Sequence, residues 1–129
     1  MKISHLDHLV LTVADIDRTA DFYQRVLGMD KVSFGEGRVA LTFGQQKINL
    51  HQSGAEFTPH AASPQPGSGD LCFIADATIG EIHESLVAAH VPISEGPVRR
   101  SGATGPIESV YFYDPDGNLI EVSTYQVSD

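Results

Sequence analysis

The chain has 129 residues, of which 41% are hydrophobic and 19% charged, as in an ordinary soluble globular protein. This length suits one domain with a single core. The formal net charge of −9 disfavours nucleic acid and anionic membranes as partners. No apolar run approaches ~18 residues, so we expect no membrane span, and the N-terminus lacks the apolar region of a signal peptide. We therefore expect a cytoplasmic protein that handles a small molecule.

The first part of the chain is typical of one strand, one helix and three further strands. A β-branched run from about His5 to Ala14 predicts the first strand, and Asp15 is a suitable N-cap for the helix. Apolar residues continue at helical spacing from Ile16 until Gly28 ends the helix. Glycine-containing turns then separate three short strands, predicted at Met29–Phe34, Arg38–Phe43 and Lys47–Gln52.

The second part of the chain repeats this order after a change in composition. Ser53–Gly69 contains three prolines and little periodicity, which indicates a linker or an ordered loop. A strand at Asp70–Asp76 precedes a helix at Thr78–His90, which we expect Pro92 to end. Strands are then predicted at Ile93–Arg100, Ile107–Tyr113 and Asn118–Tyr125.

The expected fold class is therefore α+β, with two βαβββ modules in one domain of residues 1–129. Module 1 covers about residues 1–52, the linker covers 53–69, and module 2 covers about 70–129. Aligning the two modules places His8 opposite Asp70, and Asn49 opposite Glu121.

A carboxylate stands out in the last predicted strand. The preceding segment, Asp114-Pro-Asp-Gly-Asn118, predicts a hairpin turn in which Gly117 supplies a positive φ. In the strand that follows, Glu121 interrupts an apolar run and shares one face with Ser123. Such a carboxylate lies either on a solvated face or in a site where a cation compensates its charge.

Three motifs carry a resemblance over nearly the whole chain. They are His8-Leu-Val-Leu-Thr-Val, Phe22-Tyr23-x-x-x-Leu27-Gly28 and Asp114-Pro-Asp-Gly-Asn-Leu-Ile-Glu121. The sequence thereby resembles the glyoxalase/bleomycin-resistance/extradiol-dioxygenase superfamily, also called vicinal oxygen chelate proteins. The stretches Leu50-His51-Gln and Pro66-Gly-Ser-Gly-Asp-Leu-Cys-Phe are most similar to its glyoxalase-domain-containing protein 5 branch. The resemblance implies a curled mixed sheet around an open cup, and a homodimer.

In the resembled family each module offers a metal ligand on its first and on its last strand. Carried over by position, this implies metal-ligand positions at His8, Asn49, Asp70 and Glu121. His8 and Glu121 match the family pattern, whereas Asn49 and Asp70 depart from the usual Glu and His. His51 lies two residues after Asn49, hence on the same strand face, and could replace it. We predict the metal ligands His8, His51 and Glu121, with Asp70 as the alternative third ligand.

The resemblance implies a divalent metal, Ni, Zn, Mn or Fe, with open positions for substrate oxygens. It implies a glyoxalase-I-like lyase or isomerase, similar to lactoylglutathione lyase, acting on a small substrate with vicinal oxygens. Glu121 would also serve as the proton-shuttling catalytic base. Two alternatives stay open: an Fe(II) ring-cleaving dioxygenase, and a metal-free protein that binds a small molecule or drug.

Two further features bear on the site. Arg99 and Arg100 are the one pair of adjacent basic residues, and they either meet an anionic substrate or form a surface pair. Cys72 is the single cysteine, which excludes an intrachain disulfide. Because it lies in an apolar run, we predict a small buried side chain at this position.

Overall fold

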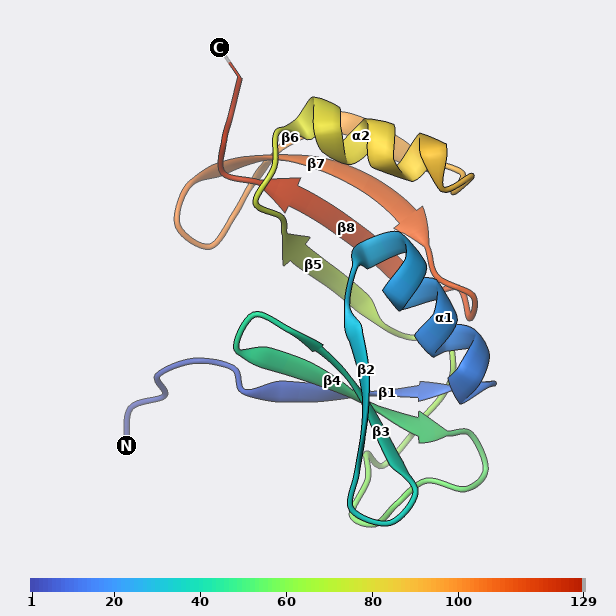
Figure 1. Ribbon diagram of the computed structural model, residues 1–129. Helices are drawn as coiled ribbons and strands as arrows, with labels where there is room; N and C mark the ends of the chain where they lie inside the picture. The colour runs from blue at the N-terminus through green and yellow to red at the C-terminus, as the bar shows by residue number, and fades with distance from the viewer. Residues whose placement is uncertain (129) are drawn as a thin grey trace. The chain divides into compact units, whose positions relative to one another are not determined.

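The computed structural model describes residues 1–128. Its elements follow the order βαβββ twice (Figure 1). They are β1 (His8–Val13), α1 (Ile16–Leu27), β2 (Asp30–Phe34), β3 (Arg38–Phe43), β4 (Gln46–Gln52), β5 (Asp70–Ile74), α2 (Ile79–Ala88), β6 (Glu95–Ser101), β7 (Pro106–Tyr113) and β8 (Leu119–Thr124). The chain divides into two compact units, Met1–Gly67 and Ser68–Asp129. The prediction of an α+β fold with two βαβββ modules is confirmed.

The first unit contains a four-stranded mixed sheet in the order β1-β4-β3-β2. β1 and β4 are parallel, and the other two pairs are antiparallel. One face of this sheet packs against α1, and the buried side chains between them form the core. They include Leu11, Val13, Tyr23, Leu41, Ile48 and Leu50. We call the opposite face, which carries the alternate side chains of the same strands, the open face of the first sheet.

The ends of α1 are those that the sequence predicts. The Asp15 side chain accepts a hydrogen bond from the Arg18 N–H at 3.1 Å, which satisfies one of the free amides at the helix start. Gly28 adopts a left-handed conformation with φ of 66°, and its N–H bonds to the Gln24 carbonyl. Glycine tolerates this conformation without strain, so the helix ends there.

The second unit repeats the topology with a four-stranded sheet in the order β5-β8-β7-β6. β5 and β8 are parallel, and the remaining pairs are antiparallel. Here α2 covers one face, and its core includes Ile82, Leu86, Val110, Phe112, Ile120 and Val122. The other face is the open face of the second sheet.

A hydrogen-bonded turn ties β8 to the start of β5. Asp114 Oδ1 accepts the N–H groups of Asp116 and Asn118, both at 2.9 Å, and Asp114 Oδ2 accepts the Asn118 side-chain amide at 2.7 Å. The Asn118 Oδ1 in turn accepts the Gly69 N–H at 2.7 Å. The turn therefore fixes where β8 begins and aligns it with β5.

Two predicted element boundaries are corrected. β1 begins at His8 rather than at about His5, since its register with β4 starts there. The second helix ends at Ala88, well before Pro92, because His90 turns into the left-handed region with φ of 59° and the Val91 N–H bonds to Leu86. Residues 53–67 cluster with the first unit, where Phe57 contacts the His51 ring.

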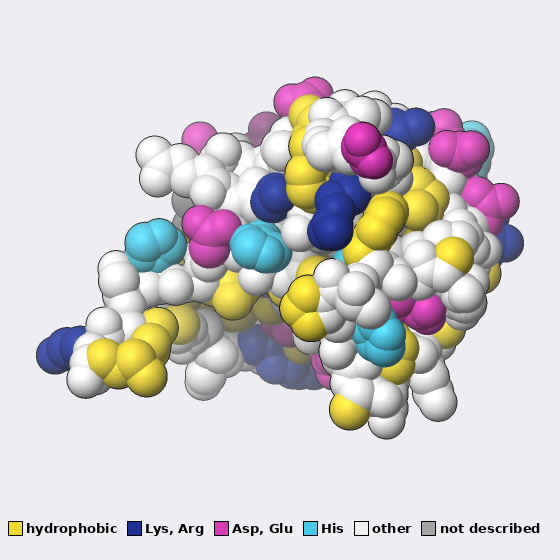
Figure 2. Space-filling view, turned by 90° about the horizontal axis from the view of Figure 1, so that it is seen from below, with side chains coloured by type: hydrophobic (Ala, Val, Ile, Leu, Met, Phe, Trp, Pro, Cys, Tyr) yellow, Lys and Arg dark blue, Asp and Glu magenta, His cyan; other side chains and the backbone are white. Residues whose placement is uncertain are grey.

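Among residues 1–128, neither helix is both long and apolar enough to cross a membrane. The space-filling view shows acidic side chains spread over the visible surface, while hydrophobic side chains reach it in small separate areas (Figure 2).

Candidate functional site

The predicted ligand positions are equivalent in the two units. Within the parallel pair of the first sheet, Asn49 lies opposite Val10, and His8 is two residues before Val10. Within the second, Glu121 lies opposite Cys72, and Asp70 is two residues before Cys72. The two registers match the alignment of the modules made from the sequence. All four predicted ligand positions lie on the open faces of the two sheets.

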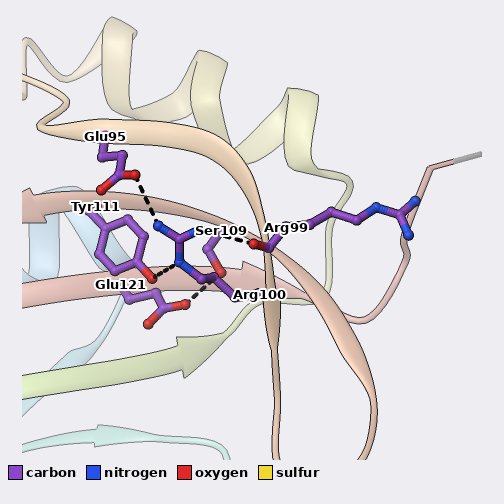
Figure 3. Close-up of polar contacts among 6 residues, drawn as sticks. All are labelled: Glu95, Arg99, Arg100, Ser109, Tyr111 and Glu121. Carbon is purple, nitrogen blue, oxygen red and sulfur yellow. Dashed lines mark hydrogen bonds and ion pairs between the residues drawn. The ribbon is translucent and has the colours of Figure 1, made fainter.

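Glu121 is held in place by two buried serines, of which Figure 3 shows Ser109. Its Oε2 accepts a hydrogen bond from Ser109 Oγ at 2.6 Å and lies 3.3 Å from Ser123 Oγ. The two hydroxyls lie 2.6 Å apart, and both serines have 0% exposure. Because Glu121 itself is half-buried, these short contacts fix one carboxylate oxygen while the side chain stays accessible.

A tyrosine and an arginine flank Glu121 on the other side. Tyr111 in β7 is the cross-strand partner of Glu121. Its hydroxyl accepts a hydrogen bond from Arg100 Nε at 3.0 Å, and Arg100 Nη2 pairs with Glu95 at 3.0 Å (Figure 3). Burial raises the pKa of Tyr111, the hydrogen bond from Arg100 opposes this, and the negative charge of Glu121 raises the pKa again. Tyr111 is therefore a neutral phenol at neutral pH.

The two adjacent arginines do different things. Arg100 joins the Tyr111 group, whereas the Arg99 guanidinium points away from it and donates to the Ser128 carbonyl (Figure 3). Alternation along β6 explains the difference, because successive side chains of a strand point to opposite faces.

A pocket of about 280 Å³ opens beside Glu121 within the second unit. Its walls are Cys72, Ile74, Ser101, Gly102, Ala103, Ile107, Glu121 and Tyr125. Gly102 permits the close approach of this wall, because a Cβ there would lie 2.5 Å from the Tyr125 hydroxyl oxygen and 3.0 Å from the Gly105 carbonyl oxygen. The pocket thus combines one carboxylate with apolar and hydroxyl-bearing walls.

The prediction of a buried Cys72 is wrong, since this side chain is exposed. The apolar run hid the alternation of β5, which places Cys72 with Asp70 on the open face. Its Sγ lies 3.3 Å from Ser123 Oγ. Although the residue as a whole is exposed, its thiol is partly buried against the sheet, which raises the pKa of the thiol. The hydrogen bond with Ser123 opposes this and the negative charge of Glu121 raises the pKa further, so the group is a protonated thiol at neutral pH.

The first unit contributes His8 and Asn49. His8 is exposed, and its Nδ1 lies 2.8 Å from the Asp7 carboxylate, a hydrogen bond that lowers the pKa of Asp7. This contact fixes the ring and leaves Nε2 for another partner. Asn49 Oδ1 is buried and has no hydrogen-bond partner in residues 1–128. A buried oxygen of this kind ordinarily has a partner, so the position suits a bound cation or water.

His51 lies farther along the same face. It is 6% exposed, and its ring meets the Phe57 ring edge-on at 5.8 Å between centroids. Burial lowers the pKa of His51, and the nearby Arg38 lowers it further. Its strand partner is Thr12, four residues from His8, or about 13 Å along the strand at the usual rise. Asn49, at about 7 Å by the same measure, is nearer to His8.

Within neither unit do three His, Cys, Asp or Glu side chains of residues 1–128 converge to hold a metal. His8 and His51 belong to the first unit, whereas Asp70 and Glu121 belong to the second. The set of His8, His51 and Glu121 therefore stays a prediction.

Sequence reasoning missed Ser109 and Gly102. Ser123 shares a strand face with Glu121 and follows from alternation alone. Ser109 lies in β7, and its place beside Glu121 could be predicted only from the register between β7 and β8. In that register Ser109 is the cross-strand partner of Ser123. Gly102 lies in a turn that closely approaches Tyr125 and Gly105. Apart from the glycine itself, nothing in the sequence indicates this close approach.

Comparison with known proteins agrees with this geometry. Residues 5–122 match the family model of the Glyoxalase/Bleomycin resistance protein/Dioxygenase superfamily. The chain is 56% identical over 126 residues to glyoxalase domain-containing protein RDO1 of Mycosarcoma maydis, covering 98% of this chain and 71% of that one. An integron cassette protein from the mobile metagenome of V. cholerae has 63% identity and a TM-score of 0.96, covering 98% of each chain. More distant is a lactoylglutathione lyase from Agrobacterium tumefaciens, with 27% identity, a TM-score of 0.74, and coverage of 97% of this chain and 96% of that one.

The chain belongs to the glyoxalase/bleomycin resistance protein/dioxygenase superfamily.

Proposed function

We propose that this protein is a metal-dependent lyase or isomerase similar to glyoxalase I. Its substrate would be a small molecule with two neighbouring oxygen atoms. The observation that carries the proposal is Glu121, a half-buried carboxylate held by Ser109 and Ser123 in the wall of a pocket of about 280 Å³. The similarity to a lactoylglutathione lyase over 97% of the chain supports this choice.

The donor groups suit a divalent metal. We infer His8 and Glu121 as ligands, with His51 as the predicted third ligand and Asp70 as its alternative. His8 has its Nδ1 engaged by Asp7, the arrangement that orients a metal-binding imidazole. The unpartnered Asn49 oxygen is a hard donor of the kind that divalent ions or their waters accept. When bound, the metal would polarise the two substrate oxygens and stabilise the enolate.

Glu121 is the proposed base. It would take a proton from the carbon next to the substrate carbonyl and return it to the adjacent carbon, which isomerises the substrate without any net gain or loss of atoms. Ser109 and Ser123 would hold the carboxylate in position for both transfers. The neutral Tyr111 would donate a hydrogen bond to the charged carboxylate. A cytoplasmic location belongs to the same proposal.

The test combines metal analysis with activity. Protein purified without chelator should contain Ni, Zn or Mn and should isomerise the hemithioacetal of methylglyoxal and glutathione. Glu121→Gln keeps the size of the side chain but removes the base, so activity should fall by about 10²–10⁴-fold. Glu84→Gln, a charge-matched change on the exposed surface of α2, should have no effect.

The other results assign other functions. Iron would favour the ring-cleaving dioxygenase. Absence of metal would favour a small-molecule binding protein, an alternative that Asn49 and Asp70 support because they replace the usual Glu and His. A Glu121→Gln variant that keeps both metal and activity would contradict the proposed role of Glu121.

A further inference from the structure

The open face of the first sheet carries two cations that form no ion pair within residues 1–128. Arg38 and Lys47 are half-buried, and neither forms an ion pair or hydrogen bond with any side chain of residues 1–128. The exposed Arg25, Lys31 and Arg100 each pair with a nearby carboxylate. The chain has 17 Asp and Glu residues against 8 Lys and Arg, so acidic residues are not scarce. The two half-buried cations therefore lack an ion pair, although Lys47 interacts with the exposed Asp7 through its charge.

Both cations lie over aromatic rings. The Arg38 guanidinium is 4.4 Å from the centre of the Phe57 ring, and the Lys47 ammonium is 4.1 Å from the centre of the Phe34 ring. Phe34 is the cross-strand partner of Arg38, so the two cations lie over neighbouring rings. His51 meets the other ring, Phe57, edge-on. We call these five residues the cation–aromatic cluster.

This arrangement leaves the charged groups available to a ligand. A ring that covers the flat side of a guanidinium stabilises it but occupies none of its N–H donors, which point outward in the guanidinium plane. Withdrawing a cation from water without a counter-ion is unfavourable, and an anion that enters relieves this. A carboxylate matches the guanidinium fork with two parallel hydrogen bonds.

Apolar side chains adjoin the cluster. Val10, Asn49, Ala40 and Val32 form one row across the four strands of the open face. Val10 is 44% and Val32 37% exposed, so both can contact a ligand. Acidic residues also lie near this face: Asp30 belongs to the row of Lys47, Asp7 bonds to His8 and interacts with Lys47 through its charge, and Glu56 interacts with His51 in the same way. The row of Arg38 itself, which contains Thr12, His51 and Phe34, has no acidic residue.

We propose that the open face of the first unit binds an organic anion, namely a carboxylate attached to an apolar or aromatic body. Arg38 binds the carboxylate through its N–H edge, Lys47 adds a second positive charge, and the valines contact the body. This site lies within the first unit and uses neither Glu121 nor the proton transfer proposed for it. It borders His51 and Asn49, which the proposed metal site also uses.

The test is a calorimetric titration of the full chain with sodium benzoate at constant ionic strength. Benzamide is the neutral molecule of the same shape, and inorganic phosphate is an anion without the apolar body. We expect saturable one-to-one binding of benzoate that is at least tenfold tighter than that of either control. Equal binding of benzamide, or equal binding of phosphate, would overturn the proposal.

Matched variants locate the site. Arg38→Gln should raise the Kd for benzoate at least tenfold and Lys47→Gln at least threefold. Arg25→Gln and Lys31→Gln remove the same charges from exposed positions, so they should change the Kd less than twofold. Glu84→Gln, on the exposed surface of α2 in the second unit, should also leave it unchanged. If Arg38→Gln fails to fold, Lys47→Gln decides, and an effect no larger than that of Lys31→Gln refutes the assignment.

Discussion

Single residues of the second unit differ sharply in how much change they tolerate, and two glycines show this. A Cβ at Gly102 would lie 2.5 Å from the Tyr125 hydroxyl oxygen, whereas at Gly80 in α2 the nearest atom would be 4.0 Å away. Gly102→Ala should therefore destabilise the fold by about 1–3 kcal/mol through overpacking. Gly80→Ala should stabilise it by roughly 0.5–1 kcal/mol, since glycine is a poor helix former.

Urea unfolding of the two variants against the parent protein measures both effects. The substitution is chemically the same, so opposite signs can arise only from the surroundings. A Gly102→Ala variant as stable as the parent would mean that residues 102–105 move aside and that this pocket wall is not rigid.

The sequence was sufficient to single out Glu121, because a carboxylate inside an apolar alternation contradicts its neighbours. It was insufficient for Cys72, where an apolar residue on each side suggested burial although the strand faces the opening. It was also insufficient for Arg38 and Lys47, since the missing ion pairs become visible only when every neighbour is placed. Local patterns therefore revealed a residue that breaks a rule, but not the absence of a contact.

At the scale of elements, the ends of the helices depend on nearby capping residues, whereas the ends of the strands depend on the neighbouring strands with which they pair. Asp15 and Gly28 were predictable because capping depends on a few consecutive residues. The N-terminal segment before His8 has β-like composition, but its backbone does not pair with β4. The side chain of Gln46, at the start of β4, bonds to the Leu6 carbonyl instead. Strand extent could not be read locally, because a strand needs a partner.

The capping box of α2 leads to a prediction about acid stability. The Thr78 N–H and hydroxyl donate to Glu81 at 3.0 and 2.9 Å, and these bonds lower the pKa of Glu81. A carboxyl group whose pKa is lower in the folded state contributes stability above its unfolded pKa, and this is lost as pH falls through the folded value. Glu81→Gln should therefore reduce the loss of stability between about pH 5 and pH 3.

Urea unfolding across this pH range gives the comparison. Glu84→Gln in the same helix serves as the control, because it removes an equal charge outside the capping box. If both variants lose stability with pH in the same way as the parent, the capping box contributes nothing to acid sensitivity.

At the scale of the whole molecule, the repeated βαβββ order could be predicted because both halves carry their own turns, caps and alternation. The equivalent positions of Asn49 and Glu121 in the two modules followed from that repeat. Function was less accessible, since within one fold it depends on a few side chains that differ between the halves. Membership of the superfamily and the two modules were therefore predictable, while the third ligand was not.

We expect a homodimer, as the family resemblance implies. Large hydrophobic side chains such as Ile3, Leu6, Val87 and Tyr113 are exposed in the single chain, and burying some of them against a second copy would be favourable. Sedimentation equilibrium should give twice the chain mass of 13.9 kDa at micromolar concentrations. A stable mass of one chain over the same range would contradict this expectation.

The turn at Asp114–Asn118 has a consequence for how this protein can change. Its hydrogen bonds to the start of β8 and to Gly69 set the register of β8 without using any side chain of the open face. A shift of the register of β8 by one residue would turn Glu121 toward the core and Ile120 outward. By fixing the register, the turn therefore fixes which face of the sheet each side chain occupies. The register of β8 therefore does not depend on the side chain at position 121, although that side chain bonds to Ser109 and Ser123. A single substitution there can introduce new chemistry while the strand keeps its register.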